Sequence, residues 1–180
     1  MKNKFLELKS VTDQAGNPYY FSHETRCAGK IVAVLPVRVT ETGIQFLLRK
    51  ELTPAWNGGS DRVFINAITG GMETKFSDSI LVNLDYTVIN ELKEEAGYEV
   101  TADELYRLGV VRAGKSCDSV YFLYTVDLTN KEQQLPEPDS KLEEMETVFW
   151  SDTVYKSDDF LPYVMYQKMV HLGSKVHIKS

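Results

Sequence analysis

The chain has 180 residues, of which 43% are hydrophobic, and a formal net charge of −6. This length and composition predict a single domain over residues 1–180, and the sequence contains no run of about 20 apolar residues that would span a membrane. The acidic balance argues against nucleic acid as the main partner, because such proteins usually carry a basic face, but it allows a small phosphorylated ligand whose charge a metal ion offsets.

The N-terminal residues and the cysteine content indicate the compartment. Residues 1–9 alternate polar and apolar side chains and lack a long apolar stretch, so we expect a strand there and no signal peptide. Two cysteines, Cys27 and Cys117, are too few for a disulfide framework. We therefore expect free thiols and a cytoplasmic protein.

Residues 1–40 are expected to form an N-terminal antiparallel sheet and the first core strand, and residues 41–180 the rest of the core. Turn-forming residues at 13–18 separate two strand patterns, and the apolar run 31–37 predicts a strand buried on both faces. The chain turns at Thr40–Gly43 and continues into another strand that ends at Arg49. Trp56, in the irregular stretch that follows, could stack on a base or cover an apolar edge.

The most informative segment begins with an apolar strand over residues 63–68, which ends at Gly70 and Gly71. Apolar residues then recur at three- and four-residue steps from 80 to 96, which predicts an amphipathic helix capped by Asn83 or Asp85 and closed by Gly97.

Three acids, Glu91, Glu94 and Glu95, occupy neighbouring parts of the predicted helix surface near its C-terminal end. The helix dipole favours cations at that end, so the acids need something to offset their charge, and a hard divalent cation with oxygen ligands is the obvious candidate. The plain alternative is a solvated helix end, but the glycines that frame the helix favour a metal beside a phosphate, with Gly71 contributing backbone near the site.

The C-terminal half contains two further strands, over 108–111 and 120–126, and the loop that joins them begins with Arg112, a cation that suits contact with phosphate. Acids at Glu143, Glu144 and Glu146 precede a strand that ends at Trp150. Glu146 alternates with Val148 and could simply be the solvent side of that strand. An amphipathic helix is expected over 160–172.

The acid segment resembles a known motif. Gly71 followed by Glu91-Leu92-x-Glu94-Glu95-x-Gly97-Tyr98 resembles the Nudix box, G-x5-E-x7-R-E-U-x-E-E-x-G-U, in which U is a bulky aliphatic residue. The back half fits at every acid and at the glycine. The front half is degenerate, because Asn90 stands where the arginine belongs and the segment from Gly71 to Asn90 is several residues too long.

The resemblance, nearest to the ADP-ribose pyrophosphatase or nucleotide-sugar diphosphatase type, implies an α/β fold. This is a Nudix-like α/β/α sandwich with a mixed central sheet and an N-terminal antiparallel sheet through which two copies commonly form a homodimer. It also implies hydrolysis of a nucleoside diphosphate linked to another moiety, releasing a nucleoside monophosphate.

The resemblance implies that the three helix acids hold Mg²⁺ or Mn²⁺. It also implies that Glu94 and Glu95 take part in catalysis. Arg49 would contact substrate phosphate, unless it is an ordinary solvated cation, and Glu143 or Glu144 would act as the base. A nucleoside triphosphate or dinucleoside polyphosphate substrate stays open, and so does a catalytically weak or inactive nucleotide-binding domain, which Asn90 and the lengthened box would explain.

Overall fold

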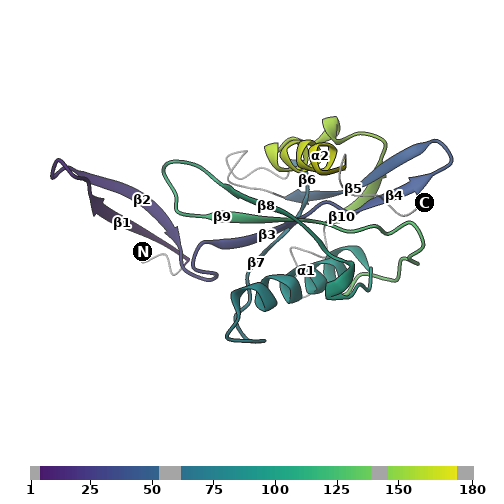
Figure 1. Ribbon diagram of the computed structural model, residues 1–180, viewed down its shortest axis with the longest axis horizontal. Coiled ribbons are helices and arrows are strands. Elements are labelled where there is room, and N and C mark those ends of the chain that lie inside the picture. Colours follow the sequence, from purple (N-terminus) through teal and green to yellow (C-terminus); the bar gives the residue numbers. More distant parts are fainter. Residues whose placement is uncertain (1–4, 53–61, 139–145, 174–180) are drawn as a thin grey trace.

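The computed structural model describes residues 5–52, 62–138 and 146–173. Within these residues the main helices are α1 (Ile80–Ala96) and α2 (Phe160–Gly173), with short 3-10 turns at Ala102–Glu104 and Val154–Lys156 (Figure 1). The strands are β1 (Leu6–Thr12), β2 (Pro18–Glu24), β3 (Lys30–Val34), β4 (Val37–Thr40), β5 (Gly43–Leu52), β6 (Val63–Asn66), β7 (Ile68–Gly71), β8 (Tyr106–Arg112), β9 (Val120–Thr125) and β10 (Thr147–Ser151).

Two four-stranded sheets form the centre of the fold. The first has the order β7-β3-β9-β8 and is mixed, because β3 pairs parallel with β9 and antiparallel with β7. In the second, the long strand β5 pairs with β10, β4 and β6. Helices α1 and α2 lie on opposite sides of these strands (Figure 1). The predicted α/β/α sandwich with a mixed sheet is therefore confirmed.

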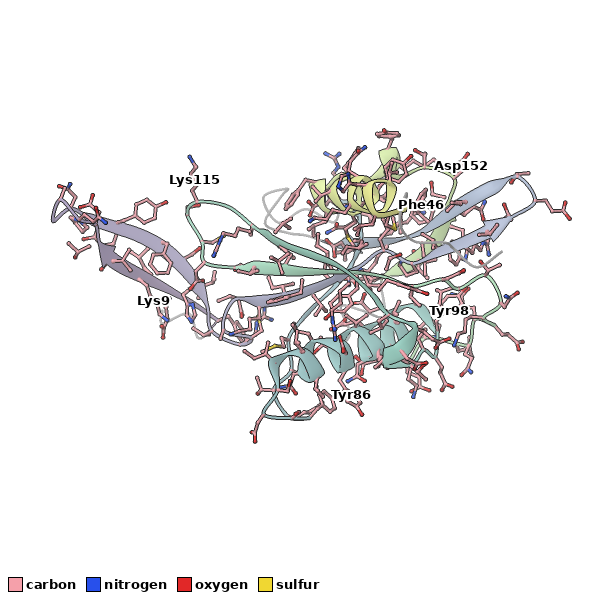
Figure 2. The ribbon with its side chains drawn as sticks, in the orientation of Figure 1. Lys9, Phe46, Tyr86, Tyr98, Lys115 and Asp152 are labelled. Carbon is pink, nitrogen blue, oxygen red and sulfur yellow. The ribbon has the colours of Figure 1, made fainter. Side chains whose placement is uncertain are left out.

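Alternation along the strands divides the apolar side chains between two cores. Val32 of β3 and Leu47 of β5 belong to the core under α1, whereas Ala33 and Leu48 belong to the core under α2. Figure 2 shows Phe46, another residue of the second core, close to α2. Because side chains alternate along a strand, the residues that follow Leu47 at steps of two point toward α1.

The apolar run that the sequence suggested as one strand, residues 63–68, forms parts of two strands in different sheets. The chain leaves β6 at Asn66, whose side-chain Oδ1 accepts the backbone N–H of Ala67 at 2.7 Å. Such a local side-chain bond competes with the hydrogen bonds of a sheet ladder. The prediction of a single strand was wrong, and the Gly70–Gly71 pair ends a separate strand, β7, beside β3.

The side chains proposed to cap α1 have other partners. Asn83 exchanges two hydrogen bonds with the backbone of Ser77, at 3.0 and 2.7 Å, and Asp85 lies inside the helix. The fully buried apolar face runs from Leu84 to Ala96 at four-residue steps. The helix is thus anchored by its packed face and by a bond back to the preceding loop.

The end of α1 is as predicted. Gly97 has a φ of +70°, which residues with a Cβ rarely adopt, and its N–H donates to the Lys93 carbonyl at 3.1 Å. A Cβ there would also lie 2.1 Å from the carbonyl oxygen of Gln134. Glycine is therefore required twice, by the turn and by the loop that crosses it.

Strands β1 and β2 form a hairpin that extends away from the two sheets (Figure 1). Its contacts are with the loop between β8 and β9, where the Tyr19 hydroxyl donates to the backbone oxygen of Lys115 and His23 lies 2.7 Å from a carboxylate oxygen of Asp118. Figure 2 shows Lys115 at the tip of that loop. The predicted N-terminal antiparallel sheet is confirmed.

The two long helices have 17 and 14 residues. Within the described ranges no helix combines the length and the apolar character that crossing a membrane requires. The cytoplasmic location expected from the sequence stays a prediction.

Tyr124 offers a test of how α1 is fixed to the sheet. Its buried hydroxyl donates to Asp85 at 3.0 Å, and Asp85 also pairs with Arg107 of β8. We expect Tyr124→Phe to lower the free energy of unfolding by about 2 kcal/mol, because a hydrogen bond to a charged group is lost. Tyr86→Phe, on the exposed side of the same helix, is the matched control. Urea denaturation measures both, and equal losses would contradict this role.

Candidate active site

The Glu91 side chain lies directly against the backbone of β7. A Cβ added at Gly70 would lie 1.7 Å from the Glu91 carboxylate oxygen Oε1. Any side chain at residue 70 would therefore displace this carboxylate. The glycine that the sequence pattern emphasised thus has a steric reason, which is to admit an acid from α1.

Glu91 and Glu95 form a buried pair one helical turn apart. Their carboxyl groups share a hydrogen bond, and burial first, then repulsion by Glu95, raises the pKa of Glu91 far above its ordinary value. Burial raises the pKa of Glu95 as well, although the Arg49 guanidinium opposes that shift. The Glu95 side chain is only 5% exposed, so this acid does not lie on a solvated part of the helix.

Arg49 is the cation of this site. Its side chain is buried, and the guanidinium pairs with Glu95 through Nη1 and with Glu51 through Nη2. Nη1 also lies 3.3 Å from Glu146, and Nη2 lies 3.0 Å from the Thr69 hydroxyl. Burial disfavours the charged form, but the three carboxylates outweigh it and raise the pKa of Arg49. The guanidinium is therefore held in one orientation by four side chains.

Sequence reasoning missed two members of this cluster. Glu146, which the sequence allowed to be the solvent side of a strand, has a side chain only 9% exposed and faces Arg49. Glu51 was not considered at all, although the alternation of Leu47, Arg49 and Glu51 along one strand places all three on the side of α1. That alternation was the available signal.

The other predicted site residues are more dispersed. Glu94 is half-buried and close enough to Glu91 to add to the repulsion on it. Gly71 pairs with Ile31 at the end of β7. Arg112 is exposed on β8, three strands from β7 and thus roughly 14 Å away across the sheet. Trp56, Glu143 and Glu144 lie outside the described residues.

A cleft of about 550 Å³ opens beside Gly70 and Gly71. Its lining comes from the end of β2 and the residues after it, from β3, β7 and β9, and from the loop after β7: Glu24, Arg26, Cys27, Ile31, Thr69, Gly70, Gly71, Met72, Glu73, Thr74 and Tyr121. The volume is in the range of small-molecule sites. Two residues that line the cleft touch the acid cluster, since Gly70 lies against Glu91 and the Thr69 hydroxyl contacts Arg49.

The donors present suit a divalent cation. Within the part of the chain that the structure describes, the buried Glu95 Oε2 has no hydrogen-bond partner. The Arg49 guanidinium pairs with Glu51, Glu95 and Glu146, and Glu91 contacts Glu95. Among the described residues, no three acidic, histidine or cysteine side chains are grouped so that they could hold a metal ion. Mg²⁺ is often held by one or two carboxylates and completes its octahedron with water and substrate phosphates, which fits the Glu91–Glu95 pair.

Gly70→Ala tests the close approach of Glu91. The clash is with the end of a flexible side chain, so we expect the fold to survive while the carboxylate moves and Mn²⁺ affinity falls by about 10- to 100-fold. Gly114→Ala is the control, because its added Cβ meets nothing closer than 4.0 Å. Calorimetric titration with Mn²⁺ and thermal unfolding measure both variants. Unchanged Mn²⁺ affinity in a folded Gly70→Ala protein would contradict the placement of the Glu91 carboxylate against Gly70.

Comparison with known proteins gives a likeness in structure only. No protein-family model and no curated protein matches the chain. An ADP compounds hydrolase matches 97% of this chain and 90% of its own at 14% identity, with a TM-score of 0.61. A proposed NUDIX hydrolase of Listeria monocytogenes matches 81% and 94% at 18% identity, with a TM-score of 0.52.

A third solved structure is the NUDIX domain of Shewanella oneidensis NrtR complexed with ADP ribose, which matches 79% of this chain and 87% of its own at 15% identity, with a TM-score of 0.55. The likeness in fold therefore covers most of this chain in all three comparisons. The protein has the fold of the Nudix hydrolases.

Proposed function

We propose that the protein is a metal-dependent Nudix hydrolase that cleaves a nucleoside diphosphate linked to another moiety, with ADP-ribose or a nucleotide sugar as the substrate. The observation that carries this proposal is the Glu91–Glu95 pair packed against Gly70, a residue that lines the cleft. Buried acids without enough countercharge are costly, and a functional site is the usual reason to retain them. The substrate class is supported by the ADP ribose bound to one structural neighbour.

Glu91 and Glu95 would hold the metal, Mg²⁺ or Mn²⁺, and Glu94 would be the third ligand when the site is loaded. When bound, the cation supplies positive charge that neutralises the diphosphate oxygens and orients a water molecule. A bound cation would offset the burial and the repulsion by Glu95 that raise the pKa of Glu91, and so favour the ionised carboxylates. The acids then serve as ligands and no longer share a proton.

The protein groups have two further tasks in the reaction. Water attacks one phosphorus, the bridging P–O bond breaks, and its electron pair stays with the departing phosphate oxygen. A carboxylate takes the proton of the water, and Glu143 and Glu144 stay our candidates for that base, with Glu94 or Glu95 as the other choice. The Gly71 backbone, Trp56 and Arg112 stay candidates for contacts with the substrate.

Turnover is tested with ADP-ribose and a panel of nucleotide sugars in the presence of Mg²⁺. We expect release of a nucleoside monophosphate, detected by chromatography. Glu95→Gln should abolish the release, because it removes a charged ligand. Glu99→Gln, an exposed acid just beyond the same helix, should leave the rate unchanged. A panel with no product under Mg²⁺ or Mn²⁺ would refute hydrolysis of this class.

A binding or regulatory role without turnover is the second candidate. It is favoured by Asn90 in place of the box arginine, and by the Arg49 guanidinium, which contacts the carboxylate that should ligate the metal. In that case the protein binds ADP-ribose in the cleft and releases no product. The same panel, read by calorimetry, separates the two candidates.

We also propose that the protein forms a homodimer through the β1–β2 hairpin. Every residue of β1 is exposed, and apolar side chains occupy both faces of the hairpin, with Leu8 at 77% and Tyr20 at 59% exposure on one face and Val11 at 54% on the other. A two-stranded sheet is at best marginally stable alone in water. A second copy that covers these side chains would bury their apolar surface and so stabilise the hairpin.

The dimer is tested by light scattering after size-exclusion chromatography. We expect a mass of two chains for the wild type and of one chain for Leu8→Glu/Tyr20→Glu, because the charges oppose burial of the hairpin. Val39→Glu, which changes a similarly exposed side chain on β4, should keep the dimer. A monomeric wild type would refute this proposal.

A further inference from the structure

The segment that carries the acids lacks the arginine that its motif leads one to expect. Asn90 occupies that position, and its side chain makes no hydrogen bond within the part of the chain that the structure describes. Lys93, the nearest cation along α1, points to Glu137 with an N–O distance of 3.0 Å. Within the described ranges, the box itself therefore supplies no cation to Glu91 or Glu95.

Arg49 brings a cation to the same carboxylates from a distant part of the chain. It lies 46 positions from Glu95, and the sheet register places it opposite Val148 of β10 and Asn66 of β6. Pairing on both sides fixes the backbone of β5 at this residue, and the alternation of the strand directs the side chain toward α1. The guanidinium thus approaches the helix from the sheet.

Both ends of the guanidinium fork are engaged. Nη1 serves Glu95 and Glu146, while Nη2 serves Glu51 and Thr69, and the Arg49 side chain is 6% exposed. A planar guanidinium with five fixed donors orients a carboxylate more firmly than an ammonium group does. A substrate phosphate would have to break these ion pairs to reach Arg49, so the arrangement suits a group that acts on its carboxylate neighbours.

We propose that Arg49 is a positioning residue that orients Glu95 for metal binding, and that it supplies from β5 the guanidinium that the box lacks at Asn90. The inference rests on the proposed function, because it assigns Arg49 a part in that same site. It differs from the phosphate contact expected from the sequence. Through Thr69, which lines the cleft, the guanidinium also links the acids to the wall on which the substrate would lie.

The first experiment compares Arg49→Lys with Arg107→Lys. Lysine keeps the buried charge but loses the fork, so the protein is expected to fold. Arg107 is the matched control, because it too pairs with an acid of α1, Asp85, but on another strand and away from the cleft. We expect Arg49→Lys to weaken Mn²⁺ binding by about 10- to 100-fold and to lower kcat with little change in KM. Arg107→Lys should change neither the Mn²⁺ affinity nor kcat.

The second experiment returns the arginine to the box. In the Arg49→Lys protein, adding Asn90→Arg should recover most of the lost Mn²⁺ affinity and kcat, since a guanidinium is again available to the acids. A raised KM at unchanged Mn²⁺ affinity in Arg49→Lys would overturn the proposal and indicate a direct phosphate contact. Failure of Asn90→Arg to recover either quantity would also overturn it.

A failure of the proposed function would look different. In that case the wild-type protein itself shows neither turnover nor Mn²⁺ binding. The positioning of Glu95 is then still measured by its side-chain carboxyl ¹³C resonance, assigned through Glu95→Gln. We expect Arg49→Lys to shift that resonance and Arg107→Lys to leave it in place. An unshifted resonance in Arg49→Lys would overturn the positioning role by itself.

Discussion

The guanidinium of Arg49 lies among the carboxylates of Glu51, Glu95 and Glu146, and a fourth acid, Glu91, contacts Glu95. Each ion removed from water costs several kcal/mol unless it is paired, and among the described residues this cluster contains one guanidinium for four acids. The remaining charge must be offset by a shared proton or by another cation. The site is therefore least stable when it is both fully ionised and without a metal, and this imbalance is the physical basis for expecting metal binding.

The fold places these groups together through ordinary features of its elements. Strand β5 runs through the second sheet, and its alternation alone carries Leu47 into the α1 core and Arg49 toward the acids. On the other side, the packed face of α1 from Leu84 to Ala96 fixes the rotation of the helix. Gly70 then decides how closely the helix acids can approach the sheet. The core and the site are thus set by the same packing.

Local pattern was enough to predict the N-terminal hairpin and the helix end at Gly97, and the resemblance to the Nudix box predicted the layered fold. Local pattern failed where a partner comes from elsewhere in the chain. Glu146 has the alternation of a solvent-facing residue, and only the position of Arg49 shows that it is buried. Strand β6 ends at Asn66, whose side chain accepts the backbone N–H of Ala67. The apolar content of the segment does not predict this hydrogen bond. The roles of Arg49 and Glu51 depend on tertiary contacts between a strand and a helix.

The lengthened box can be understood in the same terms. The extra residues lie in the segment 72–79 between β7 and α1, which is tied to the helix by bonds from Glu73 to Thr87 and from Ser77 to Asn83. The acids are held at the other end of α1 by Gly70 and by the turn at Gly97, so added length before the helix does not move them. The position of the acids therefore depends less on the number of residues in the box than on the contacts at Gly70 and Gly97. For the same reason, a cation from β5 can stand in for one at Asn90.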